Sequence, residues 1–331
     1  MLVINKTMYQ VEEFLNSCFP LCFTLNLNFS FRKINDELAI QIGQGLSFCT
    51  NLQNLALDIS GSQHQICGDG IKGLAEGLYK CLNLRSLLIN LEQKNIIGVD
   101  TENIVKILEN YQSPSKLFID LNDNSICNIG AEILAKILQK YQNLTGLILY
   151  LNKNNIDEKG AQSIADAIQS YEKITQLYLY FYKCSIGYEG IQSIAKAIKN
   201  YRNINCLRLD LNSNQIGDEG VKRIAESIQN YQNITQFDLD LSQNSISEDG
   251  AQSLANVIKN YLKITQCRLY FRNNCIGEIG ASSIVNAILN YPKNQKLELG
   301  MMDCNLGESL KISLKSQIKT CFKGNSLKVE I

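Results

Sequence analysis

The sequence repeats itself with a period of thirty residues, and this periodicity restricts the fold more than any other feature. Residues 174–203 read ITQLYLYFYKCSIGYEGIQSIAKAIKNYRN, and the next thirty residues read INCLRLDLNSNQIGDEGVKRIAESIQNYQN. One apolar residue marks the same place in each copy: Leu25, Leu55, Leu87, Leu117, Leu147, Leu177, Leu207, Phe237, Cys267, Leu297 and Leu327. These anchors are thirty residues apart except between Leu55 and Leu87, where residues 60–65 lengthen a loop by two. Such a strict period indicates an array of stacked units rather than separate round domains.

Each copy predicts one strand, one turn and one helix. Leu207, Leu209 and Leu211 alternate with Arg208 and Asp210, which is typical of a strand with one buried face. After the turn, apolar residues recur every three or four positions, as they do on the buried face of a helix. In this copy they are Val221, Ile224, Ala225, Ile228 and Tyr231.

Polar residues at two positions of the copy have predicted structural roles. An asparagine follows most strands, and its amide is expected to bond backbone groups where the chain leaves the strand. This position holds Asn124, Asn154, Asn214, Asn244 and Asn274. Cys184 and Cys304 replace the asparagine in two copies and are interpreted as small buried residues. Asp218 precedes the helical pattern of its copy and is expected to cap that helix.

The pattern Leu-x-Leu-x-Leu-x-x-Asn-x-Ile followed by a helix resembles the leucine-rich repeat, specifically its ribonuclease-inhibitor-like class. The resemblance covers about residues 21–331 and implies an α/β solenoid. In this curved horseshoe, parallel strands line the concave face and helices cover the convex face. Residues 21–331 are therefore predicted to form ten strand–helix units plus a terminal strand. Residues 1–20, in which Val11, Phe14 and Leu15 have helical spacing, are predicted to be an N-terminal helical cap.

No motif in the chain predicts a catalytic, cofactor or metal site. Gly68-x-Gly70-x-x-Gly73 has the letters of a dinucleotide-binding motif, but Gly70 belongs to a glycine column of the repeat and is interpreted as helix packing. His64 is the only histidine, which excludes the usual multi-histidine zinc sites. The chain is therefore predicted not to be an enzyme and to need no cofactor.

Charge and composition argue against nucleic acid and membranes as partners, and they indicate where in the cell the chain is located. Lys plus Arg and Asp plus Glu number 32 each, so no basic surface predicts binding to nucleic acid. No run of about 18 apolar residues predicts membrane insertion. The N-terminal residues lack the order of a signal peptide, and the twelve cysteines fall at unrelated positions of the repeat. A cytoplasmic location with reduced thiols is expected.

Variable residues between the strand leucines are predicted to form a partner-binding face. Aromatic and charged side chains cluster there, and the predicted set is Phe118, Tyr150, Tyr178, Tyr180, Tyr182, Arg208, Asp210, Asp238, Asp240, Arg268, Tyr270 and Arg272. Tyrosine and arginine are enriched at interface hot spots. Strand propensity also places aromatic residues on sheets, but it predicts an even spread rather than a cluster. The acidic residues of the set are interpreted as solvated charges of this face rather than as a hydrolytic pair.

These observations favour a non-catalytic scaffold or adaptor that binds protein partners through its concave face within a larger assembly. The alternative is a regulator, of the type of the GTPase-activating proteins for Ran or of the ribonuclease inhibitors. For the Ran activators, the resemblance implies a basic residue just before the repeat asparagine. Those positions here hold Asp123, Lys153, Ser213, Gln243 and Asn273, and Arg272 lies one residue earlier.

The end of the sequence predicts a second contact. Leu327, Val329 and Ile331 alternate with Lys328 and Glu330, thirty residues after the preceding strand pattern. A last strand there would have an unpaired outer edge, and such edges pair readily with other chains. Residues 326–331 are therefore predicted to touch a partner or a second copy, with a self-protected end as the alternative.

Overall fold

The structure is a computed structural model that describes residues 4–16, 22–30, 32–61, 66–92, 96–109, 114–292, 296–322 and 327–331. The chain forms two compact units, Met1–Asn155 and Ile156–Ile331. Residues 17–21 and His64 lie outside the described residues. The same is true of Lys94, which stands at the asparagine position of its copy, and of Tyr111, which corresponds to Tyr231.

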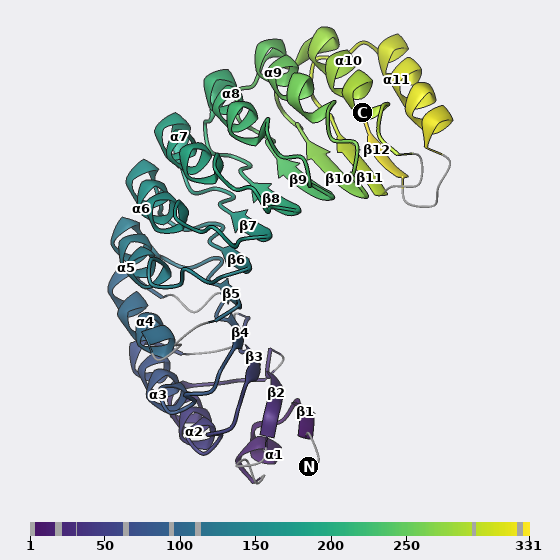
Figure 1. Cartoon of the computed structure of the whole chain (residues 1–331). Helices are drawn as coiled ribbons and strands as arrows, with labels where there is room; N and C mark the ends of the chain where they lie inside the picture. Colours follow the sequence, from purple (N-terminus) through teal and green to yellow (C-terminus); the bar gives the residue numbers. More distant parts are fainter. Residues whose placement is uncertain are drawn as a thin grey trace. The chain divides into compact units, whose positions relative to one another are not determined.

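The first unit alternates strands and helices along the chain (Figure 1). Its strands pair in chain order and in parallel from β1 to β6. The elements are β1 (Ile4–Met8), α1 (Val11–Leu15), β2 (Cys22–Asn28), α2 (Asp36–Leu46), β3 (Asn54–Asp58), α3 (Gly68–Leu78), β4 (Ser86–Asn90), the 3-10 turn η1 (Gly98–Asp100), α4 (Thr101–Glu109), β5 (Lys116–Asp120), α5 (Asn128–Leu138) and β6 (Gly146–Tyr150).

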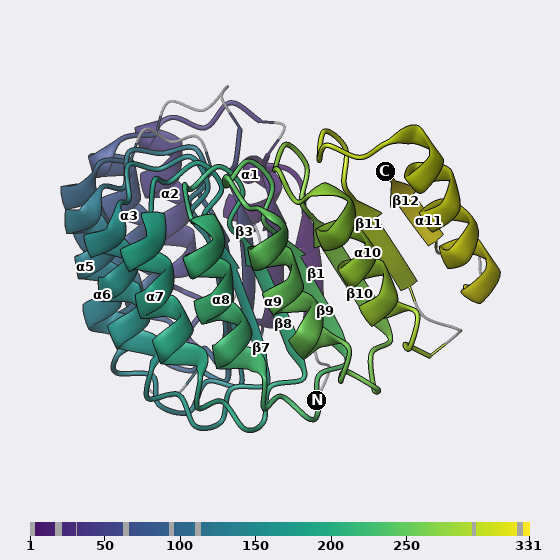
Figure 2. The ribbon, with the colours of Figure 1, turned by 90° about the horizontal axis from the view of Figure 1, so that it is seen from above.

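The second unit continues the same alternation, with β7 to β12 paired in parallel and in chain order. Its elements are α6 (Glu158–Ile168), β7 (Gln176–Tyr180), α7 (Gly187–Ile198), β8 (Cys206–Asp210), α8 (Gly217–Ile228), β9 (Gln236–Asp240), α9 (Glu248–Ile258), β10 (Gln266–Tyr270), α10 (Gly277–Ile288), β11 (Lys296–Gly300), α11 (Glu308–Cys321) and β12 (Leu327–Glu330). The helices lie side by side along one face of the strands (Figure 2). We call the other face of β7–β12 the open sheet face.

The predicted strand and helix periods are confirmed by burial. Leu207, Leu209 and Leu211 are at most 2% exposed, whereas Arg208 and Asp210 between them are half-buried. On the helix that follows, Val221, Ile224, Ala225, Ile228 and Tyr231 are all buried. The core of each copy therefore lies between its strand and its helix, because both elements turn their apolar faces toward that layer.

The asparagine position has the predicted role. The Asn214 side chain is fully buried. Its amide donates to the carbonyl of Phe181 at 2.7 Å, and its oxygen accepts from the N–H of Ile186 at 3.2 Å. Asn244 repeats both contacts one copy later. Each asparagine thus joins its own turn to the turn of the preceding copy. Cys304 occupies the asparagine position of its copy. Its buried thiol replaces one of the asparagine bonds and donates to the carbonyl of Phe271 at 2.9 Å.

The capping prediction for Asp218 is wrong. Gly217 has a φ of +65° and already belongs to α8, so Asp218 lies inside the first turn of that helix. Its Oδ1 accepts from the N–H of Ser247 at 2.8 Å and of Gly250 at 3.2 Å, and its Oδ2 from the Ser247 hydroxyl. Asp218 therefore caps α9, the helix of the next copy.

The N-terminal segment contains a strand that the sequence did not predict. β1 pairs in parallel with β2, and α1 follows it, with Val11 and Phe14 buried. The division into a cap of residues 1–20 and an array of residues 21–331 stays a prediction.

The glycine interpretation is supported in α3. A Cβ on Gly70 would lie 2.4 Å from Asp36 Oδ1, and one on Gly73 would lie 2.5 Å from Ile40. Both glycines therefore allow α3 to pack against α2, which accounts for the motif without a nucleotide.

Candidate protein-binding surface

Two rows of side chains cross the open sheet face in strand register. The first, which we call the paired row, consists of Tyr178, Arg208, Asp238, Arg268, Glu298 and Lys328 on β7 to β12. The second, which we call the aspartate row, consists of Tyr180, Asp210, Asp240, Tyr270, Gly300 and Glu330. Neighbouring strands lie about 4.8 Å apart, so successive members of a row are within reach of one another.

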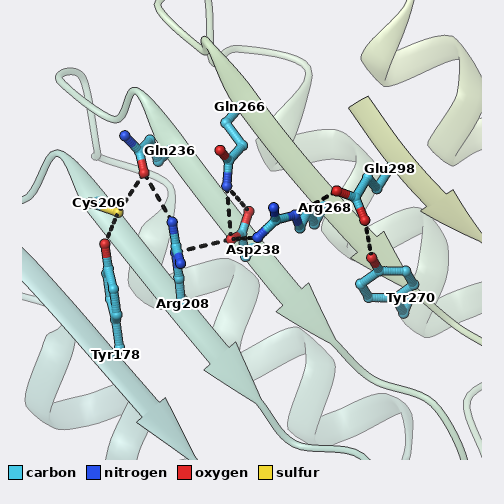
Figure 3. A network of polar contacts seen from close by, with 9 residues as sticks. All are labelled: Tyr178, Cys206, Arg208, Gln236, Asp238, Gln266, Arg268, Tyr270 and Glu298. Atoms are coloured by element: carbon cyan, nitrogen blue, oxygen red, sulfur yellow. Dashed lines mark hydrogen bonds and ion pairs between the residues drawn. The ribbon is translucent and has the colours of Figure 1, made fainter. Parts of the chain in front are cut away.

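Charges alternate along the paired row and neutralise one another (Figure 3). Arg208 Nε lies 3.0 Å from Asp238 Oδ2, and Arg268 Nη1 lies 3.2 Å from the same oxygen. Arg268 also pairs through Nε with Glu298 Oε1 at 2.9 Å. The side chain of Asp238, which both arginines share, is 12% exposed. Because one buried acid holds two arginines, this network is more ordered than isolated surface ion pairs.

Neutral groups complete the network at its β7 end. The Arg208 guanidinium lies over the Tyr178 ring, 4.4 Å from its centroid, in cation–π geometry. Arg208 Nη2 donates to Gln236 Oε1 at 3.2 Å, and the Cys206 thiol donates to the Tyr178 hydroxyl oxygen at 3.1 Å. Burial is the main cause that raises the pKa of Tyr178 to about 12, so its hydroxyl stays protonated at neutral pH.

Two further bonds hold the β10 end of the network. Gln266 Nε2 donates to Asp238 Oδ2 at 3.2 Å, and the Tyr270 hydroxyl donates to Glu298 Oε2 at 2.6 Å. The Tyr270 hydroxyl is the main cause that lowers the pKa of Glu298. Burial raises the pKa of Asp238, and the two arginines oppose that shift.

Sequence reasoning missed Cys206, Gln236, Gln266 and Glu298 as members of this surface. Two signals were available. Glu298 continues the alternation of charge along one column of the repeat, and the other three lie one residue before a strand anchor. That position lies two residues before an outward-facing residue of the strand, so its side chain is on the same face of the sheet.

The aspartate row has no such neutralisation at its centre. Asp210 and Asp240 are opposite each other on β8 and β9, and both are half-buried. They lie in a shallow hollow of about 240 Å³ that Tyr180, Arg208, Asp238, Arg268, Tyr270 and Glu298 also line. Burial, followed by repulsion from Asp240, raises the pKa of Asp210 to about 7. Burial also raises the pKa of Asp240, while hydrogen bonds from Ser242 and the positive charge of Arg272 oppose that shift.

The far end of the aspartate row is closed by an ion pair. Arg272, in the turn after β10, reaches Glu330 on β12 and lies 5.2 Å from the Tyr270 ring centroid. Gly300 lies on the strand between them. A Cβ on Gly300 would meet Tyr270 at 2.8 Å and Arg272 Nε at 3.0 Å, so the missing side chain makes room for this contact.

Two of the predicted residues, Phe118 and Tyr150, belong to the first unit and contact each other. The rings of Phe118 and Tyr150 lie 5.4 Å apart with a tilt of 51°. In the second unit, Tyr182 follows β7, and the Lys183 ammonium lies 5.2 Å from its ring centroid. The structure thus gathers Tyr178, Arg208, Asp238, Arg268 and Tyr270 into one network.

The described residues offer neither a metal centre nor a membrane-spanning helix. In that part of the chain, no group of three or more His, Cys, Asp or Glu side chains is arranged to hold a metal ion. Among the same residues, no helix has the length and apolar character needed to cross a membrane.

Comparison with known proteins identifies the repeat. A sequence model of the leucine-rich repeat matches residues 203–225 and 238–255. No curated protein matches the chain. Similar solved structures include an internalin (InlF) from Listeria monocytogenes, with 16% identity over 86% of this chain and 82% of that one and a TM-score of 0.41. Another is the actin-binding site 2 of leiomodin-1, with 14% identity over 47% of this chain and 86% of that one and a TM-score of 0.37.

Residues 203–225 and 238–255 thus match the leucine-rich repeat, and the α/β solenoid expected from the sequence is confirmed by the parallel strands and the helices that alternate with them. Proteins of this fold generally act as non-catalytic scaffolds whose sheet surface binds other proteins.

Proposed function

We propose that the chain is a protein-interaction scaffold or adaptor of the ribonuclease-inhibitor-like class. In this proposal it works within a larger assembly in the cytoplasm and binds its partner through the open sheet face of β7–β12. The observation that carries the proposal is the network from Tyr178 to Glu298, which orders aromatic and arginine side chains beside a hollow.

Two physical arguments support this surface as a partner site. Tyrosine and arginine offer large contact areas, and they dominate the energetics of many interfaces. In addition, Arg208, Arg268 and Tyr270 are already held by neighbours. Long side chains that are ordered before binding lose less conformational entropy when a partner arrives. A partner would therefore meet a preorganised surface.

The regulator alternative receives no support from Arg272. An arginine that acts on a bound GTPase must present its guanidinium to the partner. The Arg272 guanidinium instead pairs with Glu330 and is about one-third exposed. We therefore propose that the chain does not stimulate GTP hydrolysis.

The proposal includes a second contact at residues 326–331. The N–H of Met301 donates to the carbonyl of Glu330 at 2.7 Å, and β12 pairs with β11 along one edge. Among the described residues, no strand pairs with its other edge. Residue 326 lies outside the described part of the chain.

The test is cross-linking mass spectrometry in a native extract, with the full chain as bait. We expect cross-links on the open sheet face and a loss of partner signal of more than tenfold for the Tyr178→Ala and Tyr180→Ala double variant. Truncating two hot-spot residues typically removes at least about 2 kcal/mol of binding energy.

The matched control removes two tyrosines from the helix side, by Tyr79→Ala and Tyr188→Ala. This variant should keep the partner. Circular dichroism checks that both double variants are folded. Equal partner recovery with both variants, or cross-links confined to the helices, would contradict the proposal.

A further inference from the structure

The central pair of the aspartate row differs from every other charged contact on the open sheet face. Asp238 and Glu298 each face an arginine on a neighbouring strand. Asp210 and Asp240 face each other. In the described part of the chain, no salt bridge joins either of these two carboxylates to a cation. Like charges directly opposite on adjacent strands destabilise a sheet, and partial burial increases the cost of each charge.

The hollow around this pair has an excess of negative charge. Four carboxylates line it, from Asp210, Asp238, Asp240 and Glu298, whereas two cations do, from Arg208 and Arg268. Arg208 and Arg268 are already committed to Asp238 and Glu298. Above about pH 7, where Asp210 is ionised, the charges of Asp210 and Asp240 therefore remain without a salt bridge among the described residues, although Arg272 partly offsets the charge of Asp240.

The same hollow has aromatic walls. Strand register places Tyr180 next to Asp210 and Tyr270 next to Asp240, so the row reads tyrosine, aspartate, aspartate, tyrosine across β7 to β10. Both rings line the hollow. A cation between the two carboxylates would have an aromatic ring on each side, which adds cation–π attraction to the ion pairs.

We propose that this hollow receives one basic side chain, an arginine or a lysine, of a protein partner, held between the carboxylates of Asp210 and Asp240. The proposal rests on the proposed function and adds the chemistry of the partner. Charge complementarity selects the occupant, because a neutral or acidic side chain would leave the excess charge of the hollow uncompensated.

Binding of a cation here is linked to proton release. The charged and titratable groups that line the hollow with Asp210 are Tyr180 from β7, Arg208 from β8, Asp238 and Asp240 from β9, Arg268 and Tyr270 from β10, and Glu298 from β11. Asp240 raises the pKa of Asp210, and the charge of Arg272 acts in turn on Asp240. Its pKa of about 7 in the free chain falls when a cation arrives. Affinity for a basic side chain should therefore rise with pH through about 7 and then level off.

The probes are the peptide Ac-Gly-Gly-Arg-Gly-Gly-amide, its lysine form and its citrulline form, titrated into the full chain. Side-chain carboxyl signals of ¹³C-labelled aspartate report occupancy by NMR. We expect the arginine or lysine peptide to shift the signals of Asp210 and Asp240, and to bind at least tenfold more tightly than the neutral citrulline peptide.

The variant Asp210→Asn with Asp240→Asn should reduce that affinity at least tenfold. It should also stay folded, because it removes a repulsion. The control variant, Asp166→Asn with Asp249→Asn, loses the same charge from exposed helix positions and should bind as the wild type does.

Two results overturn the inference. One is equal affinity for the basic and citrulline peptides, and the other is equal loss of affinity in both double variants. If either occurs while Tyr178→Ala with Tyr180→Ala still abolishes partner capture, only the basic side chain is rejected. If the tyrosine variant also retains its partner, the proposed surface is rejected as well.

Discussion

Asn214 is buried at the point where the chain leaves β8, and each polar atom of its amide has backbone partners. The nitrogen donates to the carbonyls of Phe181 and Asn212, and the oxygen accepts from the N–H groups of Cys184 and Ile186. Three of these four backbone groups are in the preceding copy, so one side chain holds two turns together.

Replacing Asn214 by Ala should lower the free energy of unfolding by about 1–3 kcal/mol, because buried backbone groups lose their partners. Urea unfolding followed by circular dichroism measures the change. Asn256→Ala, at an exposed position of α9, serves as control and should change stability by less than about 0.5 kcal/mol. An unchanged urea midpoint for Asn214→Ala would mean that the asparagine bonds contribute no stability.

Asp210 should make stability depend on pH. An unfolded aspartate has a pKa of about 4, whereas that of Asp210 in the folded chain is about 7. The folded state therefore binds more protons between these values, and its stability falls as pH rises through that window. The cost of this group is absent below about pH 4 and is complete above about pH 7.

Asp210→Asn removes that cost, because asparagine does not ionise. The variant should match the wild type near pH 4 and exceed it in stability at pH 7.5. Urea midpoints at pH 4.5, 6 and 7.5 measure the difference, with Asp166→Asn as control. A gap between variant and wild type that does not change with pH would contradict a raised pKa.

The start of α9 depends on the copy before it. The bonds from Asp218 satisfy the N–H groups of Ser247 and Gly250 at the beginning of α9, where no earlier helical carbonyl is available. The first turn of α8, which contains Asp218, has no side-chain cap.

Asp218→Ala should therefore loosen α9 and leave α8 unchanged. Hydrogen exchange by mass spectrometry should show faster exchange at residues 247–251 than in the wild type, with residues 217–221 unaffected. Asp249→Ala, whose carboxylate lies on an exposed part of α9, provides the comparison. Faster exchange confined to α8 would restore the original expectation that Asp218 caps its own helix.

The sequence predicts the repeated elements well because each one shows its own periodicity. Leucines at alternate positions mark the strands, and the asparagine after them marks the turn, so the sequence alone predicts both elements. β1 was missed because INKTM is a single short segment outside the repeat frame. The role of Asp218 was missed because its partners are about thirty residues further along the chain.

The candidate surface was predictable in outline only. Parity along the strands identifies which residues face outward, and this placed Tyr178, Arg208 and Asp238 on one face. The sequence does not reveal which acid each arginine selects. That choice depends on side-chain reach, and Arg268 contacts two acids while Arg272 passes Gly300 to reach Glu330.

Across the second unit, consecutive helices from α6 to α11 pack against one another. Stability in such arrays is nearly a sum of single copies and their nearest-neighbour contacts. The effect of a core mutation should therefore weaken with distance along the chain.

Leu239→Ala tests this expectation, because Leu239 on β9 is 1% exposed. Removing a buried leucine side chain typically costs about 2–5 kcal/mol. Hydrogen exchange should become faster in β8, β9, β10 and the helices α8 and α9, and much less so in α11 and β12. Leu262→Ala, at an exposed position, serves as control. Uniformly faster exchange from residue 156 to residue 331 would indicate a single cooperative core instead.

The alternating signs of the paired row limit how this array can change its number of copies. Arg208, Asp238, Arg268 and Glu298 occur at intervals of thirty residues, and each contacts the charge of the next strand. Duplicating any one of these copies, or deleting the copy of Asp238 or of Arg268, would place two arginines or two acids side by side. Duplicating or deleting two copies would keep every neighbour opposite in sign. From β8 to β11, gene duplication can therefore change the chain length without breaking the network only in steps of sixty residues, or two repeats.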